Sequence, residues 1–205
     1  MKSHFNILSL NINGLRGNDR RRNIFYWLKQ LMYDIILLQD VRYCEGDCVL
    51  WSGEWGLPAL WSSHNAILLT NKSMSITKLD SPGLLDRCLL GSIHRESMQE
   101  DLVVGSIYIP AERSARRQFL DRMPGNIYDS LCLLGGDFNT VANPTTDYFP
   151  AKSERASRDW CTLLEVMQLW NVSDLHTKYN SGVSQLTHWQ NTQVGPVGSR
   201  IDYIL

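Results

Sequence analysis

Residues 131–140 read Leu-Cys-Leu-Leu-Gly-Gly-Asp-Phe-Asn-Thr, and no other stretch constrains the fold as strongly. Four apolar residues are typical of a short buried strand, and the two glycines then let the backbone turn and approach another group closely. Asp137 and Asn139 follow two apart, which in an extended segment puts both side chains on the same side. The decapeptide therefore predicts either a polar site at the end of a buried strand or an Asx turn that closes it.

The first forty residues predict a strand, a helix and a second strand. Alternating residues at 4–12 indicate the first strand, and the apolar run at 34–40 indicates a buried second strand. Between them we expect a helix capped by Asp19 and ending near Tyr33. Its inner face is expected to consist of Ile24, Trp27, Leu28, Leu31 and Met32.

The middle of the chain predicts paired strands. We expect a long loop with a possible edge strand at 43–64, a hairpin from 66–70 and 73–79, and a second pair from 88–94 and 102–109. A helix should follow from Arg113 to about Tyr128, interrupted at Pro124 and Gly125.

The last third predicts a loop, a helix and two strands. A Pro/Thr/Asn loop at 141–152 precedes a helix capped by Ser153 and ending near Leu169, with Trp160, Leu163, Leu164 and Met167 on its inner face. Strands at 186–190 and 200–205 flank a Gly-Pro loop. Strand pairs between β-α units favour an α/β protein of one domain, with two packed mixed sheets covered by helices.

The net charge of −1 gives the chain no global field that would attract nucleic acid. Polyanion binding would have to use local arginine clusters, which are more often solvated helix faces. There are three: Arg20, Arg21 and Arg22; Arg113, Arg116 and Arg117; and Arg200.

The cysteines and the hydropathy indicate the cellular compartment in which the protein is expected. Cys132 and Cys161 lie in apolar contexts and are expected in the core, while Cys44 and Cys48 lack a second pair with zinc-ligand spacing. No window suits a secretory leader or a membrane span. We expect a soluble, intracellular, reduced protein.

Polar residues recur at the ends of the apolar runs. They are Asn11, Asp40, Tyr108, Asp137 and Asp202, with Thr187 inside the penultimate strand. Strand ends of α/β sheets are common ligand sites, and three carboxylates brought together need a cation or hydrogen-bond donors to stay ionised. Oxygen ligands of this kind suit Mg²⁺ or Mn²⁺.

Six segments together resemble the successive motifs of the endonuclease/exonuclease/phosphatase superfamily. Within it they are most similar to the apurinic-type endonuclease domain of non-long-terminal-repeat retrotransposons. The segments are Leu10-Asn11-Ile12-Asn13-Gly14-Leu15, residues 34–40, Ile107-Tyr108-Ile109-Pro110, Gly136-Asp137-Phe138-Asn139-Thr140, Thr187-His188-Trp189 and residues 199–205.

The resemblance implies a four-layer α/β sandwich and metal-dependent phosphodiester hydrolysis. It places Asp40 as the principal metal ligand, assisted by Asn11, and Tyr108 against the phosphate. Asp137 would orient or deprotonate the attacking water, and Asn139 would donate to a phosphate oxygen. Asp202 would orient a histidine, with Asn13, Thr187 and Arg200 in support. Such donors and one divalent ion neutralise a diester anion and position its nucleophile.

Two departures from the family pattern stand out. The family's metal-binding glutamate is Asp40 here, one methylene shorter, so weaker metal affinity is expected. The family also continues to a Ser-Asp-His segment, whereas this chain ends at Leu205 and none of its five histidines is a clear substitute. We therefore expect residues 1–205 to be a truncated domain that lacks at least one C-terminal strand, which would leave a sheet edge unpaired.

Each singled-out side chain also has a structural interpretation. These are a strand-ending turn at Asn13, an aromatic cluster rather than base stacking at Trp51, Trp55 and Trp61, a core-edge Tyr108, packing by His188 and Trp189, and a surface ion pair of Asp202 with Arg200.

The leading hypothesis is a Mg²⁺-dependent, DNA-nicking endonuclease of a mobile element. It would act on double-stranded DNA in the nucleus and be joined to a downstream reverse transcriptase. The alternatives are a phosphoinositide or nucleotide phosphatase on the same scaffold, with a closed pocket instead of a groove, and a degenerate fragment without catalysis.

Overall fold

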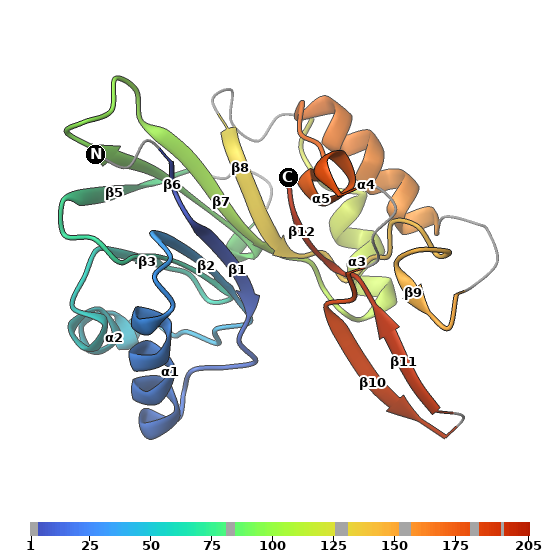
Figure 1. Cartoon of the computed structure of the whole chain (residues 1–205), viewed down its shortest axis with the longest axis horizontal. Helices are drawn as coiled ribbons and strands as arrows, with labels where there is room; N and C mark the ends of the chain where they lie inside the picture. The colour runs from blue at the N-terminus through green and yellow to red at the C-terminus, as the bar shows by residue number, and fades with distance from the viewer. Residues whose placement is uncertain (1–3, 81–84, 126–130, 152–156, 181–184, 194) are drawn as a thin grey trace.

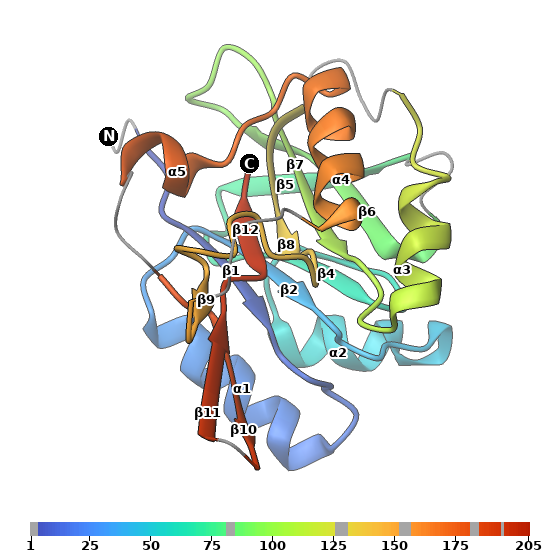
Figure 2. The same ribbon diagram turned by 90° about the vertical axis from the view of Figure 1, so that its right-hand side faces the viewer.

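Two β-sheets stack face to face, with helices on both outer faces. The computed structural model describes residues 4–80, 85–125, 131–151, 157–180, 185–193 and 195–205. Helices α1 (Asn18–Gln30) and α2 (Cys48–Trp55) cover one sheet, and α3 (Arg113–Leu120) and α4 (Arg158–Leu169) cover the other (Figures 1 and 2). The expected four-layer α/β sandwich is confirmed.

The first sheet has the order β1-β2-β4-β3. Its strands are β1 (Ile7–Asn11), β2 (Ile35–Gln39), β3 (Ala59–Trp61) and β4 (Asn65–Leu69). β1 and β2 are parallel and joined through α1, and the other pairs are antiparallel. The carboxyl ends of β1 and β2 therefore lie side by side, with Asn11 opposite Gln39.

The second sheet has the order β12-β8-β7-β6-β5. Its strands are β5 (Met74–Leu79), β6 (Cys88–Arg95), β7 (Leu102–Tyr108), β8 (Leu131–Asp137) and β12 (Asp202–Ile204). β7 and β8 are parallel, and the other pairs are antiparallel. Both main sheets are therefore mixed, as expected.

The smaller elements lie mostly around the second sheet. β9 (Tyr148–Phe149), β10 (His188–Thr192) and β11 (Gly195–Ser199) form a small antiparallel sheet, from which the β10–β11 hairpin projects away from the body (Figure 1). Helix α5 (Leu175–Tyr179) lies beside β12, and short 3₁₀ turns occupy Glu45–Asp47 and Leu85–Arg87.

Strand β2 shows why the layers form. All five of its residues are buried, because both faces of the strand are covered. Ile35 and Leu37 point into the layer between the two sheets, while Ile36 and Leu38 point outward against α1 and α2. The apolar run thus contributes side chains to two different hydrophobic cores. The polar residue Asp40 follows where the strand ends.

Three expectations in the first half were wrong. Within residues 43–64 the expected edge strand is confirmed as β3, but part of the expected loop is helix α2. Trp51, Trp55 and Trp61 are buried there in an aromatic cluster, which confirms the packing interpretation over base stacking. β4 and β5 do not form a hairpin, because the chain crosses between sheets at this turn. The third concerns the inner face of α1.

That inner face is made by Phe25, Leu28 and the buried Arg21, whereas Trp27 and Met32 are largely exposed. The N-cap is Gly17, so Asp19 lies in the first turn and is not the cap. Leu28 is buried as expected, and Ile24 and Leu31 are partly buried against the same core. The prediction missed Arg21, which is buried and bound to Glu54, because a sequence pattern assigns arginine to solvent.

Further corrections concern the second half. Helix α3 ends at Leu120, and α4 begins at Arg158 with Ser157 as its N-cap, while Ser153 lies outside the described residues. Leu164 is partly exposed, and so is Cys161, which was expected in the core; the side chain of Cys132 lies outside the described residues. The Gly-Pro segment after residue 194 is strand β11, and α5 and the short β9 were not expected.

Candidate active site

Three of the expected site residues lie next to one another on neighbouring strands. In the register of the second sheet, Tyr108 of β7 is opposite Asp137 of β8, which in turn is opposite Asp202 of β12. Asp202 begins its strand, and not ends it as expected. It reaches the same edge because β12 runs antiparallel to β8.

Residues of the first sheet join this edge. The amide Nδ2 of Asn11, at the end of β1, donates a 2.8 Å hydrogen bond to Oδ2 of Asp137. The two residues are 126 positions apart in the sequence and belong to different sheets. Asp40 follows β2 immediately, beside Asn11. The strand ends of both sheets therefore meet in one polar cluster, which we call the rim cluster: Asn11, Asn13, Asp40, Arg42, Tyr108, Asp137, Asn139 and Asp202.

Asn13 and Asn139 hold the turns that end their strands. The backbone N–H of Asn13 donates to Oδ1 of Asn11 at 3.0 Å, and that of Asn139 donates to Oδ1 of Asp137 at 2.9 Å. The side-chain amide of Asn139 donates to the carbonyl of Ile109. The Asx-turn interpretation is therefore correct for residues 137–139, and the same turn fixes the orientation of the Asp137 carboxylate.

Backbone strain is concentrated in this cluster. Among the described residues six non-glycine residues have positive φ, and four of them belong to the rim cluster: Asn13 (51°), Asp40 (53°), Arg42 (58°) and Asn139 (48°). Such conformations cost about 1–3 kcal/mol each and persist where the surroundings enforce them. Three of the four are Asn or Asp, the non-glycine residues that adopt this conformation most readily, and all four lie in the turns that follow the strands.

The electrostatics of the cluster are those of crowded acids. Burial raises the pKa of Asp137 to about 6, and the nearby charges of Asp202 and Asp40 act in the same direction. Hydrogen bonds from Asn11 and Asn139 oppose the shift. Burial also raises the pKa of Asp202, against a hydrogen bond from Thr187 and the charge of His188. A carboxylate that ionises near neutral pH is suited to accept a proton.

Tyr108 carries two neighbours that were not expected. Its pKa is raised by burial and by the charges of Asp40 and Asp137, while Arg87 and Arg42 oppose the shift. The guanidinium of Arg87 lies over its ring at 5.3 Å, and the imidazole of His64 lies at 5.9 Å. Nδ1 of His64 is buried without a hydrogen-bond partner among the described residues. None of the six motifs contains His64, yet the fold brings it to the edge of the site.

Asp40 is already paired. Both of its carboxylate oxygens accept hydrogen bonds from Arg42, at 3.2 Å to Nε and 2.9 Å to Nη2. Among the described residues, no three His, Cys, Asp or Glu side chains are arranged to hold a metal ion. The oxygen donors are chemically right for Mg²⁺, but in this arrangement the expected principal ligand is held by a guanidinium. A cation bound by Asp40 would therefore share this carboxylate with Arg42 or replace the guanidinium.

Thr187 and Arg200 have different roles from each other. The hydroxyl of Thr187 accepts hydrogen bonds from the backbone N–H groups of Ile201 and Asp202, and so buttresses the start of β12 as expected. Arg200 is buried and pairs with Asp147 and Asp174, and not with Asp202. The proposed surface ion pair of Asp202 is thus wrong, and Arg200 supports the site through the fold.

The other arginine clusters also have internal partners. Arg21 and Arg22 pair with Glu54, and Arg116 and Arg117 pair with Asp159. Arg20 donates to the carbonyls of Ile12 and Gly14, which braces the turn after β1. Most of the expected polyanion-binding charge is therefore used inside the molecule.

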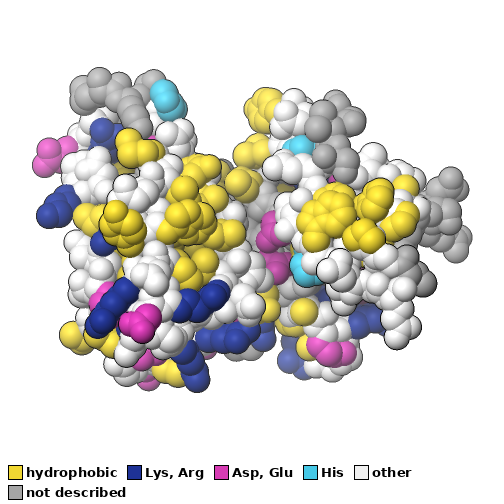
Figure 3. All heavy atoms as spheres, turned by 60° about the horizontal axis from the view of Figure 1, so that its bottom comes forward, with side chains coloured by type: hydrophobic (Ala, Val, Ile, Leu, Met, Phe, Trp, Pro, Cys, Tyr) yellow, Lys and Arg dark blue, Asp and Glu magenta, His cyan; other side chains and the backbone are white. Residues whose placement is uncertain are grey.

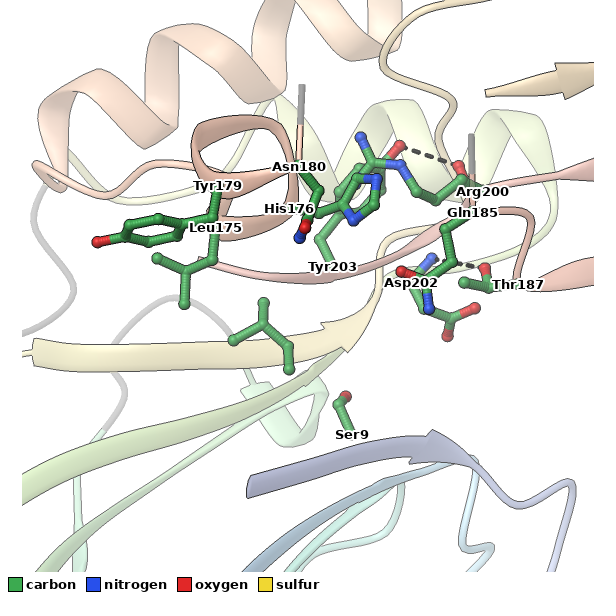
Figure 4. Close-up of a pocket in the computed structure, with 11 residues that line it drawn as sticks. Ser9, Leu175, His176, Tyr179, Asn180, Gln185, Thr187, Arg200, Asp202 and Tyr203 are labelled. Atoms are coloured by element: carbon green, nitrogen blue, oxygen red, sulfur yellow. Dashed lines mark hydrogen bonds between the residues drawn. The ribbon is translucent and has the colours of Figure 1, made fainter. Parts of the chain in front are cut away.

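Hollows flank the cluster. Figure 3 shows a groove between the two halves of the molecule, with acidic and histidine side chains inside it and Lys and Arg side chains nearby. A cavity of about 350 Å³ lies beside α5 and β12, and Ser9, Thr187 and Asp202 are among its lining residues (Figure 4). Asp202 thus links the rim cluster to this cavity, whereas Asp137 is only 4% exposed.

Solved structures of known proteins share this architecture. The endonuclease domain of TRAS1, a telomere-specific non-LTR retrotransposon, matches 98% of this chain and 84% of its own chain, with a TM-score of 0.62 and 14% identity. An AP endonuclease from Leishmania major has a TM-score of 0.66 and 14% identity, covering 98% and 78%. A 3′ phosphatase from Neisseria, bound to product DNA, has a TM-score of 0.65 and 17% identity, covering 98% and 86%.

Sequence comparison adds one transposon protein. The chain is 23% identical over 183 residues to the uncharacterized 149 kDa protein of transposon TX1 from Xenopus laevis. This match covers 83% of the chain but spans 14% of that protein's length. No protein-family profile matches the chain.

The class of fold follows from these likenesses. The chain has the fold of the endonuclease/exonuclease/phosphatase proteins, which confirms the resemblance seen in its motifs. More particularly, its similar proteins include a retrotransposon endonuclease domain and a transposon protein. None of the described helices has the length and hydropathy needed to span a membrane.

Proposed function

We propose that this chain hydrolyses phosphodiester bonds in DNA, as a nicking endonuclease of a mobile element. The observation that carries the proposal is the hydrogen bond from Asn11 to Asp137, which unites two sheets around a carboxyl with a pKa of about 6. Tyr108 and Asp202 flank that carboxyl in register. The fold shared with DNA-processing proteins, and the transposon relative, support the same reaction class.

The rim cluster supplies what attack by water on a diester requires. Asp137 is ionised at neutral pH and is placed to orient a water molecule and accept its proton. Asn11 and Tyr108 offer an amide and a phenol to a phosphate oxygen, and Asn139 adds a second amide. Asp202 keeps the local field negative, which favours proton transfer to Asp137.

We further propose Mg²⁺ or Mn²⁺ as the cofactor, with Asp40 and Asn11 as the residues that would hold it. When bound, such an ion neutralises charge on a non-bridging phosphate oxygen. Arg87 and Arg42 add positive charge near the site, because both lie close enough to Tyr108 to oppose the rise in its pKa.

Duplex DNA fits the open site better than a small phosphate ester does. The molecule has an open groove that contains acidic and histidine side chains (Figure 3), whereas a phosphoinositide or nucleotide phosphatase was expected to show a closed pocket. The projecting β10–β11 hairpin carries Trp189, which is 56% exposed and lies near Phe149. We propose that these rings contact DNA beyond the scissile bond. We propose action on nuclear DNA and a reverse transcriptase as the downstream partner.

The test is nicking of supercoiled plasmid in Mg²⁺, using the 205-residue chain and the same chain extended through its downstream coding sequence. Asp137→Asn is the inactivating variant, and Arg95→Gln, at the far end of β6, is the control. We expect conversion to open circles by the unmodified protein and the control, and loss of it in Asp137→Asn. Absence of nicking by both unmodified forms, or undiminished nicking by Asp137→Asn, would contradict the proposal.

The phosphatase alternative has a separate readout. One similar structure is a 3′ phosphatase bound to product DNA, so release of phosphate from 3′-phosphorylated DNA belongs in the assay. Phosphate release without strand cleavage would indicate a phosphatase that acts on 3′-phosphorylated DNA. If a folded chain shows neither activity, the degenerate fragment is favoured.

A further inference from the structure

Arg42 makes a three-point contact that no motif required. Its guanidinium donates to both oxygens of Asp40, and Nη2 also donates to Oδ1 of Asn13 at 2.7 Å. A planar guanidinium matches a carboxylate in this two-bonded way, and such pairs are among the stronger hydrogen-bonded contacts. Asp40 thus carries its own counter-ion, drawn from a residue two positions later.

The two surrounding turns are shaped around that counter-ion. Asp40 and Arg42 both have positive φ, as does Gly14 (88°) in the facing turn. A Cβ on Gly14 would lie 3.2 Å from Cδ of Arg42, so glycine leaves the space in which the arginine lies. The turns are joined by a 2.7 Å bond from the N–H of Gly14 to the carbonyl of Asp40. The contact is therefore part of the built structure.

The same contact is exposed enough to be exchanged. The side chain of Arg42 is 54% exposed, while that of Asp40 is 14% exposed. Because the guanidinium side of the pair is in contact with water, the released arginine can be rehydrated when a competing cation displaces it. The carboxylate would then gain the stronger partner, and the arginine would keep its charge in the groove.

We propose that Arg42 and the divalent cation compete for Asp40, so that metal binding requires the guanidinium to leave. The proposal rests on the proposed function, because it concerns the cation expected for that reaction. The released guanidinium offers its donor fork to a phosphate of the substrate. Asp40 is then shielded by Arg42 until the metal arrives, and the shorter acid is matched to an internal cation.

Binding of Mn²⁺ tests the competition without any need for catalysis. Free Mn²⁺ is counted by electron paramagnetic resonance during titration of the 205-residue chain and of Arg42→Gln. We expect Arg42→Gln to bind Mn²⁺ about three- to tenfold more tightly, because the competing charge-assisted pair is gone. Arg42→Lys, which keeps the charge but loses the fork, should lie between the two.

Two controls separate competition from a general charge effect. Arg95→Gln removes the same charge at the far end of β6 and should leave Mn²⁺ affinity within about twofold, because exposed charges at that range are screened. In the Asp40→Asn background, Arg42→Gln should give no gain. Circular dichroism of each variant checks that the fold is kept.

The competition idea is overturned if Arg42→Gln binds Mn²⁺ no more tightly than the unmodified chain, or if the gain persists in the Asp40→Asn background. These outcomes are distinguishable from failure of the proposed function. A chain that nicks no DNA can still show the shift in Mn²⁺ affinity, and an active chain can fail to show it.

Discussion

Arg200 and Asp202 are two positions apart in the sequence but belong to two polar clusters with different burial and charge. Arg200 pairs with Asp147 and Asp174 in a buried ion triad. The guanidinium carbon of Arg200 lies 4.5 Å from the centre of the Tyr203 ring. Asp202 belongs to the rim cluster, where carboxylates crowd one another. Within three consecutive residues, the chain therefore supplies a side chain to each of the two clusters.

The two clusters shift pKa values in opposite directions. Burial would raise the pKa of Asp174, but hydrogen bonds from Arg200 and Thr177 outweigh it and leave the pKa lowered. Burial raises that of Asp137 to about 6, and the neighbouring acids add to the rise. Buried charge that is paired serves the fold, whereas buried charge left in excess is available for chemistry.

The largest expected contrast is in activity. Asp137→Asn should lower the nicking rate by about 10²–10⁴-fold, the usual contribution of a positioned base. Its free energy of unfolding should stay equal or rise, because a buried charge is removed. Rate measurements paired with denaturant melts check this, and a variant that lost stability but kept its nicking rate would reverse the assignment.

Breaking the triad should have the opposite outcome. Arg200→Met leaves Asp147 and Asp174 buried without their cation, and such losses cost about 3–5 kcal/mol of stability. Urea unfolding of Arg200→Met measures the loss. At temperatures where the variant remains folded, its nicking rate should stay within a few-fold of normal, and a large drop in rate without a drop in stability would contradict the structural role.

The pH dependence of stability should separate the clusters further. The folded pKa of Asp137 lies above its unfolded value, so the stability that protonation provides is complete below about pH 4 and is lost as pH rises through about 6. The loss is of order 2–3 kcal/mol at most. Asp174, with a lowered folded pKa, instead loses its contribution as pH falls through that value.

Unfolding free energies measured in chelator from pH 3 to pH 8 check these signs. The decline between about pH 4 and 6 should be reduced in Asp137→Asn, and the acid limb should remain. An unchanged profile in that variant would show that Asp137 is not the group responsible.

The smallest expected effect concerns backbone strain. Met32 has φ of 59° just after α1, outside the rim cluster and 76% exposed. Met32→Gly should therefore stabilise by about 0.5–1 kcal/mol with no effect on nicking. Asp40→Gly relieves a similar strain (φ 53°) but should abolish nicking. Thermal melts and plasmid assays on both variants test whether strain at the rim serves activity.

Sequence alone predicted those parts that depend on local pattern. Buried runs such as Ile35–Gln39, each followed by a polar residue, placed the strands and their ends correctly. Helix α2 was missed because Gly53 and three neighbouring apolar residues give no helical period. The turn at Asn71 gave no sign that the chain changes sheets there.

Partners were harder to predict than positions. Arg200 and Asp202 looked like a pair because they are close in sequence, yet the partners of Arg200 lie 53 and 26 residues away. The roles of Arg87 and His64 follow from packing on Tyr108, which no spacing reveals. The sequence does show a cation, Arg42, two residues after the expected metal ligand Asp40. The contact between them could not be predicted from sequence, because it depends on the positive φ of both residues.

The contrast between the two clusters is tested most directly by nuclear magnetic resonance of side-chain N–H groups. A short DNA duplex is titrated into ¹⁵N-labelled protein with Ca²⁺ present, and the Nε–H signals of Arg42, Arg87 and Arg200 are followed. The account predicts that Arg42 and Arg87 shift on DNA binding, while Arg200 keeps its position. A shift of Arg200 alone, or shifts of none of the three at saturating DNA, would contradict the assignment of the rim cluster as the site of phosphodiester binding.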